Sequence, residues 1–370
     1  MAGRKLRTLT APQLCPNSSL NTYILTEKSH PSHSYQELLL SRRCLIFLEN
    51  QVFFRCRSAL WSEDTLYHET PNITNPNGGT SQDLPLLRSP DPNPLLNYME
   101  VLFRYNYREF TQESDALNGM AGILRHISRN LGGSTLEGLP TACFDYSLIF
   151  WHQFGLPKRR EMFPSWSWAG WSGHTVCITM HEGFEVGEWI TSSTYVVWFK
   201  RLPLTGDVER VWEAPALRIG QEENGRERPY IPTPLVVSED EVPYGYHLLQ
   251  FWSCAVEFPG RLLYKTKDNR AAVIYDGANG GEVGRILLDD QDFDLNGDGP
   301  FEFILLSQWE ASALKNFWGE MPNRGFYWAM LVGREGSGRI YKRKGLGYIY
   351  RDRVSCGLPP GVVWREFVLA

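Results

Sequence analysis

The polar residues with the clearest chemical potential lie together near residue 40. Gln36 and Glu37 precede an apolar stretch that ends at Ser41, Arg42 and Arg43. A glutamate beside two arginines could act as a general acid or base, or could anchor a ribose. It could equally form a structural ion pair with one of the arginines. The residue types alone favour the ion pair.

A second group of oxygen-bearing side chains resembles the opening of a calcium-binding loop. Asp292, Asp294 and Asn296 supply oxygens at positions one, three and five, and a glycine follows at position six. The twelfth position, where the loop needs a glutamate, holds Phe303, and Glu302 is one residue out of register. The flanking sequence favours strands, whereas an EF-hand needs helices. We therefore expect a tight acidic hairpin turn here and no bound metal.

No other motif of phosphate chemistry or nucleophilic catalysis stands out. The chain lacks both the glycine-rich phosphate loop that ends in Lys-Ser/Thr and the Gly-x-Ser-x-Gly elbow. The glycine-rich residues 333–338 lie between two strand-like segments and predict a β-turn. The basic run at 339–344 is short, and we expect it to be the solvated end of a hairpin. No cofactor is predicted.

A dense aromatic segment spans residues 163–171, Phe-Pro-Ser-Trp-Ser-Trp-Ala-Gly-Trp. Pro164 disfavours a helix at its start, and Gly170 permits a tight exit. The three tryptophans are Trp166, Trp168 and Trp171. They could form a packed corner, or a platform on which a sugar or base stacks. Buried indoles would exclude the platform, and we expect burial because it is the commoner case.

Helical periodicity is confined to the first half of the chain. Apolar residues of 95–103 fall on one helical face, and a second helix is expected from Ser114 to Gly132. In that helix Ser114 would be the N-cap and Asp115 would lie in the first turn. Residues 44–57 predict a β-hairpin with Glu49-Asn50 as its turn.

The second half of the chain reads as strands separated by Gly, Pro, Asn and Asp. This order predicts an α+β fold whose C-terminal region is mainly antiparallel β. The predicted strands are 176–180, 194–199, 247–256, 271–275, 285–288, 301–307, 326–332 and 362–369.

Composition limits the classes of protein to which the chain can belong. It has 370 residues, of which 42% are hydrophobic and 13% aromatic, and a net charge of −5. This charge provides no general attraction to nucleic acid or anionic membranes, and no apolar run approaches the roughly 20 residues of a membrane span. The seven cysteines are scattered without a Cys-x-x-Cys pair, which is typical of reduced thiols in a cytoplasmic protein.

Three blocks of the chain, in order, resemble blocks of fungal heterokaryon incompatibility (HET) domain proteins. Residues 35–43 resemble the family's W-T-[FY]-Q-E-x-x-L-S-R-R block. Residues 105–123 resemble Y-S-x-R-x-L-T-x-x-S-D followed by A-[LS]-x-G-[IL], and residues 164–171 resemble P-S-W-S-W-A-G-W. The signature residues are Tyr35, Gln36, Glu37, Ser41, Arg42, Arg43, Arg108, Ser114, Asp115, Pro164, Trp166, Trp168, Gly170 and Trp171.

The chain also departs from the family pattern. His33 stands where the family usually has a tryptophan, and the family's first two blocks have no counterpart in residues 1–31. The expected organisation is a poorly ordered or mis-started stretch at 1–32, and the C-terminal part of a HET-like domain at 33–173 with an exposed loop at 68–94. A β-rich domain follows at 174–370.

The resemblance implies a role in fungal non-self recognition, in which HET domains trigger a cell-death response with other proteins of that pathway. The domain is remotely similar to TIR-type domains, some of which cleave NAD. A parallel sheet without its first strands loses the crevice in which ligands bind. We therefore interpret the chain as an incomplete, non-catalytic HET protein. The alternatives are an NAD-cleaving effector that uses Glu37 and a carbohydrate-binding β module that uses the tryptophans.

Overall fold

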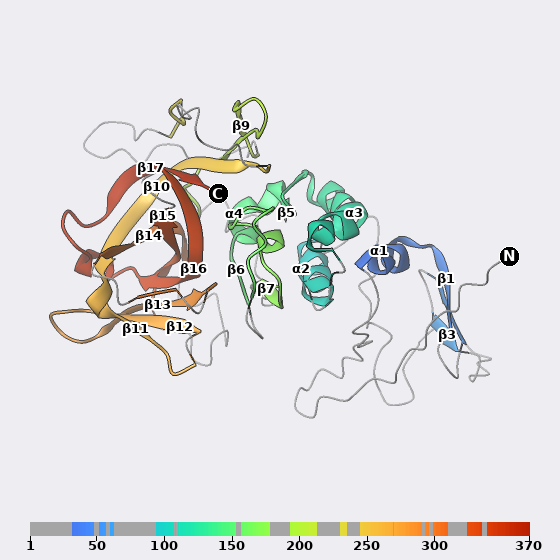
Figure 1. Ribbon diagram of the computed structural model, residues 1–370, viewed down its shortest axis with the longest axis horizontal. Helices are drawn as coiled ribbons and strands as arrows, with labels where there is room; N and C mark the ends of the chain where they lie inside the picture. The colour runs from blue at the N-terminus through green and yellow to red at the C-terminus, as the bar shows by residue number, and fades with distance from the viewer. Residues whose placement is uncertain are drawn as a thin grey trace. The chain divides into compact units, whose positions relative to one another are not determined.

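The computed structural model combines helices with antiparallel sheets, as the α+β prediction requires (Figure 1). The chain divides into two compact units, residues 1–130 and 131–370, and each is described by itself. The structure describes residues 32–47, 52–56, 60–62, 94–106, 108, 110, 112–152, 157–177, 193–212, 230–234, 245–268, 270–290, 293–295, 299–309, 324–334 and 339–370.

The division between the units falls earlier than the expected domain boundary at residue 173. It lies between Asn130 and Leu131, at the end of a helix. The tryptophan segment therefore belongs to the second unit. The physical reason is its bonding to that unit's last strands, since Ser165 accepts a hydrogen bond from the backbone N–H of Arg343 and donates to the carbonyl of Ala370.

The first unit contains helices and a small antiparallel sheet of strand order β1-β2-β3. Its elements are α1 Ser32–Leu40, β1 Arg43–Phe47, β2 Val52–Cys56, β3 Leu60–Ser62, α2 Pro94–Asn106, η1 Glu113–Ala116, η2 Asn118–Met120 and α3 Ala121–Leu131. The pairing of β1 with β2 confirms the predicted hairpin. Its predicted turn, Glu49-Asn50, lies outside the described residues.

The two predicted helices of this unit are present, but the second begins later than expected. α2 buries the apolar face formed by Leu95, Tyr98, Met99 and Leu102. The prediction that Ser114 is an N-cap is wrong, because Ser114 lies inside η1 and Gln112 occupies the cap position without a side-chain hydrogen bond. Two short 3₁₀ turns thus precede α3. Gly132 ends α3 as predicted, with a φ of 78° that favours glycine.

The second unit starts with short elements around the tryptophan segment and continues into a large sheet. The short elements are β4 Thr135–Leu136, β5 Leu139–Pro140, η3 Thr141–Cys143, α4 Phe144–Ser147, β6 Phe150–His152, η4 Trp168–Gly170 and β7 Thr175–Cys177. The sheet region comprises β8 Phe199–Arg201, β9 Val208–Arg210, β10 Leu248–Pro259, η5 Gly260–Leu262, β11 Leu263–Lys265, β12 Ala271–Tyr275, β13 Glu282–Leu288, β14 Pro300–Trp309, β15 Phe326–Arg334, β16 Ile340–Tyr350, η7 Val354–Cys356 and β17 Val363–Leu369.

Strand β17 closes part of the large sheet into a ring. The sheet has the order β11-β12-β13-β16-β15-β14-β10-β8-β9. β17 pairs antiparallel with β10 and parallel with the start of β16, so that β10, β14, β15, β16 and β17 form a closed circuit (Figure 1). Closure pairs the backbone groups that a sheet edge would otherwise expose.

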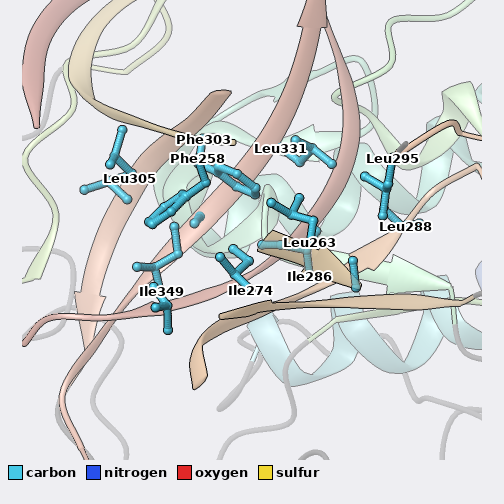
Figure 2. Packing of buried hydrophobic residues seen from close by; sticks show 14 residues of the cluster. Phe258, Leu263, Ile274, Ile286, Leu288, Leu295, Phe303, Leu305, Leu331 and Ile349 are labelled. Carbon is cyan, nitrogen blue, oxygen red and sulfur yellow. The ribbon is translucent and has the colours of Figure 1, made fainter. Parts of the chain in front are cut away.

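The core of the second unit lies against β10 and β12 to β16. Phe258 and Phe303 meet edge to face with ring centroids 5.7 Å apart. Figure 2 shows these rings surrounded by aliphatic side chains, among them Ile286, Leu331 and Ile349, all fully buried. The side chains come from strands far apart in sequence, so this core depends on the correct strand order.

Strand β16 differs more from the prediction made from the sequence than any other described strand does. The sequence predicts that residues 339–344 are the solvated end of a hairpin. In the structure, residues 340–344 are instead the start of a long strand that lies between β13 and β15. Glycines at 345 and 347 break the apolar pattern and conceal the strand. They permit close packing, because a Cβ on Gly347 would lie 1.9 Å from the carbonyl oxygen of Arg285, and one on Gly345 would lie 2.5 Å from that of Leu287.

The connection between β13 and β14 also differs from its prediction. Its acidic residues were expected to form a hairpin turn, but β13 pairs with β12 and β16, whereas β14 pairs with β10 and β15. The connection therefore joins two strands that are not neighbours in the sheet, so β13 and β14 do not form a hairpin. By contrast, β15 and β16 pair antiparallel from Arg334 and Tyr341 onward, as a turn in the glycine-rich residues between them requires.

Within the described residues, no helix has both the length and the apolar character needed to cross a membrane.

Candidate functional site

Gln36, the signature glutamine, positions a helix. It lies on α1, and its Oε1 accepts a hydrogen bond from the backbone N–H of Gly122 at 2.7 Å. Gly122 is the second residue of α3, so its N–H has no acceptor within that helix. The glutamine thus caps α3 from outside. A Cβ on Gly122 would lie 2.7 Å from Cδ1 of Leu40 and 3.0 Å from the Gln36 oxygen, which explains the glycine.

Glu37, the candidate acid or base, is exposed on the next position of α1. Its backbone carbonyl accepts hydrogen bonds from the N–H and the hydroxyl of Ser41, at 3.1 and 2.6 Å. Arg42 and Arg43 are exposed too, and in the described part of the chain neither forms an ion pair with Glu37. The expected structural bridge is therefore not formed. Glu37 therefore lies on the exposed side of α1.

Tyr35 joins the first sequence block to the second. Its buried ring lies 5.9 Å from the ring of Tyr105, and the guanidinium carbon of Arg108 lies 4.4 Å above its centre. The hydroxyl of Tyr105 donates to the carbonyl oxygen of Ala116 at 2.9 Å, next to Asp115. Tyr35, Arg108 and Gln36 thus act as packing and capping residues of the first unit. Ser114 remains exposed.

The tryptophans of the third block are all buried, as predicted. Trp166 and Trp168 have no exposed surface and Trp171 is 4% exposed. The indole N–H of Trp168 donates to the carbonyl oxygen of Gly138 at 3.2 Å, and that of Trp171 donates to the carbonyl of Ser165 at 2.8 Å. No indole face is free for a sugar or base to stack upon. The segment is a packed corner of the second unit.

Gly170 and Pro164 determine the tight geometry of this corner. A Cβ on Gly170 would lie 2.2 Å from the carbonyl oxygen of Pro164. The guanidinium of Arg159 lies beside the turn and donates to the carbonyls of Gly170 and Phe163, at 2.8 and 2.6 Å. The signature glycine is therefore explained by close backbone approach, without reference to a ligand.

A buried ion pair that the sequence did not reveal anchors the corner to the sheet. Arg343 of β16 is 1% exposed, and its Nε and Nη2 donate to the two carboxylate oxygens of Asp289 at 2.8 and 3.2 Å. The same guanidinium donates to the carbonyls of Leu148 and Phe150 and lies 3.9 Å from the Phe150 ring centre. Burial raises the pKa of Asp289, and Arg343 opposes this shift. Side chains of a strand alternate between its two faces, and this alternation over residues 340–344 was the signal from which burial of Arg343 could have been predicted.

His152 lies beside this ion pair, with its Nε2 4.0 Å from Oδ1 of Asp289. Both ring nitrogens are buried, and neither has a hydrogen-bond partner among the residues that the structure describes. Burial, together with the positive charges of Arg343, Arg160 and Arg270, lowers the pKa of His152 to about 3. The imidazole is therefore neutral at physiological pH and does not carry the second ring proton with which an imidazolium acts as a general acid.

Buried thiols and a buried carboxyl lie around α4. Burial raises the pKa of Cys143 and that of Cys177 to about 12, so both remain protonated at neutral pH and are poor nucleophiles. Burial raises the pKa of Asp145 to about 7, and its Oδ1 accepts a hydrogen bond from the indole N–H of Trp198 at 2.9 Å. Cys143, Cys177 and Cys356 are free thiols.

The structure describes the calcium-like sequence only in part. Asp294 is exposed, whereas the adjacent Leu295 is buried in the core of the sheet. Asp292 and Asn296 lie outside the described residues. Among the described residues, no group of three or more His, Cys, Asp or Glu side chains could hold a metal ion.

The fold and these sites define an α+β protein with a partly closed antiparallel sheet in the second unit, in which Gln36 caps a helix and Tyr35 and the three tryptophans are packed. Comparisons with models of protein families, with curated proteins and with solved structures find no match.

Proposed function

We propose that this chain is a HET-type protein that takes part in fungal non-self recognition through interactions with other proteins in the cytoplasm, without catalysis of its own. The proposal starts from the three sequence blocks between residues 35 and 171 that resemble the HET family. It concerns interaction and signalling, and it assigns no substrate or cofactor.

One observation carries the proposal beyond the sequence. The first two blocks, which are separated by more than 60 residues, meet through the Gln36–Gly122 hydrogen bond and the Tyr35–Arg108 contact. Matching residues that depend on one another for packing support a shared fold more strongly than isolated matches do.

The environment of the candidate catalytic residues supports a non-catalytic role. Gln36 is occupied in capping α3, and Glu37 is exposed and forms no ion pair with Arg42 or Arg43 within the described residues. The buried thiols of Cys143 and Cys177 remain protonated. Catalytic residues must be reactive and within reach of a substrate, and neither the bonded Gln36 amide nor the buried, protonated thiols meet this need.

The test combines an assay in cells with an assay on the purified chain. In a fungal host, expression is expected to change the fraction of dead cells in the contact zone between incompatible strains. Glu37→Ala should leave this effect intact, whereas Gly170→Val should abolish it because the added side chain disrupts the corner. An unchanged death fraction with wild-type chain would contradict the proposal.

Incubation of purified chain with NAD separates the proposal from the enzymatic alternative. We expect no loss of NAD over the buffer control. Loss of NAD that Glu37→Ala abolishes, while Gln36→Glu or a distant change such as Tyr264→Phe preserves it, would replace the proposal with an NAD-cleaving effector.

A further inference from the structure

A short segment of the second unit, residues 230–234, lies against β10 and β17 without forming a strand of its own. Its sequence is Tyr-Ile-Pro-Thr-Pro. Three side chains of the sheet hold its backbone: Gln250 and Trp252 from β10, and Glu366 from β17. We call these three residues the Gln250–Trp252–Glu366 surface.

The three side chains form hydrogen bonds with backbone groups at alternate residues of the segment. The indole N–H of Trp252 donates to the carbonyl of Ile231 at 3.1 Å, and Nε2 of Gln250 donates to the carbonyl of Thr233 at 2.7 Å. The carboxylate of Glu366 accepts the backbone N–H of Thr233 at 2.7 Å, and it also accepts the Thr233 hydroxyl. Such alternate contacts suit an extended chain, whose residues i and i+2 face the same side.

A contact within the sheet orients Gln250 of this surface without help from the segment. Nη2 of Arg201, on β8, donates to Oε1 of Gln250 at 2.8 Å. Because this oxygen is occupied, the amide nitrogen of Gln250 must face Thr233 and the carboxylate of Glu366, from which it lies 2.8 Å. Trp252 and Glu366 are direct cross-strand neighbours of β10 and β17. A buried amide with both ends bonded is held in one orientation.

The sequence of the segment matches this surface. Ile231 and Thr233 each precede a proline, and residues before proline favour extended backbone. Pro232 and Pro234 have no N–H and a restricted φ, so the segment loses little conformational entropy when it docks. The one N–H between the prolines is that of Thr233, and Glu366 accepts it.

We propose that the Gln250–Trp252–Glu366 surface is a peptide-binding site for extended Pro-x-Pro sequences with a hydroxyl residue between the prolines. Residues 230–234 occupy it as a resident ligand that an equivalent peptide of a partner protein displaces. The segment is suited to exchange, because Ile231 is 65% exposed and Thr233 and Pro234 are exposed as well. Tryptophan N–H groups that bind the carbonyls of proline-rich peptides are a recurring mode of recognition.

Tethering favours the resident segment over a free peptide. A covalently linked ligand competes at an effective concentration on the order of millimolar. A free peptide of the same sequence therefore binds the unchanged chain weakly, and binds well only when the segment is weakened or removed. This difference allows a direct test on the full chain.

The probe is a fluorescein-labelled peptide of residues 228–236, Arg-Pro-Tyr-Ile-Pro-Thr-Pro-Leu-Val, followed by fluorescence anisotropy. The first variant replaces residues 230–234 with Gly-Ser-Gly-Ser-Gly. The second is Thr233→Pro, which removes both bonds to Glu366 and leaves the surface itself unchanged. Both variants should bind the peptide at least about tenfold more tightly than the unchanged chain.

Two controls assign the binding to this surface. Adding Trp252→Phe and Glu366→Gln to either variant should weaken binding at least about tenfold, whereas Tyr264→Phe on β11 should leave it unchanged. A peptide with alanine in place of both prolines should bind more weakly. Equal peptide affinity for all chains would overturn the proposal, as would absence of binding to a variant that still unfolds cooperatively. If the replacement of residues 230–234 prevents folding, the peptide affinity of the Thr233→Pro variant decides the test.

Discussion

At the scale of single residues, the most consequential group is the buried pair of Arg343 and Asp289. Both carboxylate oxygens are bonded, and two main-chain carbonyls take further donors of the guanidinium. Such a pair need not add net stability, but removing one partner leaves an uncompensated charge in the core. Its role is to join β16 to the elements around the tryptophan corner.

This argument predicts unequal effects of single and double substitutions. Asp289→Leu should lower the free energy of unfolding by about 3–5 kcal/mol, because Arg343 then remains charged and buried. The double variant Asp289→Leu, Arg343→Met should recover much of that loss. Urea unfolding measures both, and Glu209→Gln in the exposed Lys200–Glu209 pair is the control with an effect near zero. A double variant as unstable as the single one would contradict this account.

Asp145 provides a prediction of pH dependence at the same scale. Its pKa is raised to about 7 by burial, so between about pH 4 and 7 the folded chain holds a proton that the unfolded chain has lost. The free energy of unfolding therefore falls as the pH rises through this range. Asp145→Asn cannot ionise and keeps an acceptor for Trp198. Relative to wild type, it should gain about 4 kcal/mol between pH 4 and pH 8 in urea titrations.

At the scale of elements, the packing of α1 against the start of α3 depends on a glycine and a glutamine. Alanine normally stabilises a helix relative to glycine. Here a Cβ at residue 122 would meet Leu40 and the Gln36 side chain, and would disturb the hydrogen bond that caps α3. Local propensity and packing thus oppose each other at this position.

We expect packing to dominate over propensity at this position. Gly122→Ala should lower the melting temperature of the first unit's transition and raise amide exchange in α1 and α3. Gln36→Ala should cost about 1 kcal/mol through loss of the cap. Because the shorter side chain at position 36 also makes room for the added Cβ, the double variant should cost less than the sum of the two single ones. A Gly122→Ala chain that is more stable than wild type would show that α1 and α3 do not pack in this way.

At the scale of the whole molecule, the pH dependence of the free energy of unfolding reports on the burial of His152. Its pKa is about 3 in the folded chain and about 6.5 in the unfolded chain. Between these values the unfolded chain binds the additional proton, so the free energy of unfolding falls as the pH drops. This is opposite in sign to the effect of Asp145.

His152→Leu removes this acid sensitivity. Between pH 7 and pH 4 the wild-type chain should lose about 3 kcal/mol more than the variant, from unfolding midpoints in urea. His126 on α3 is half-exposed, and His126→Leu serves as the matched control for replacing a histidine with leucine. Parallel stability curves for wild type and His152→Leu would show that water reaches the imidazole.

The sequence predicted those features whose signal is local. α2 follows from the spacing of Leu95, Met99 and Leu102, and the burial of the tryptophans follows from their size. The end of α3 follows from Gly132, the residue type that the left-handed backbone there favours. The hairpin of β1 and β2 follows from two apolar runs around a short connection. Each of these needs only neighbouring residues.

The sites were harder to predict because their partners are distant in sequence. The sequence shows Gln36 only as the neighbour of Glu37, the residue predicted to pair with Arg42 or Arg43, whereas the partner of Gln36 in the structure is Gly122. The basic run that contains Arg343 was expected to be solvated, because Asp289 and the carbonyls that bury it lie more than 50 residues away. Glycines at 345 and 347 hid the strand that carries it.

By itself, the sequence determined the α+β class, the order of helices before strands, and the burial of the aromatic segment. These depend on periodicity and on the cost of exposing large apolar side chains. Only the tertiary structure decided that β17 closes a ring, that Arg343 is buried, and that residues 230–234 dock on Gln250, Trp252 and Glu366. Strand order and side-chain partnerships depend on contacts across long loops, which no local pattern encodes.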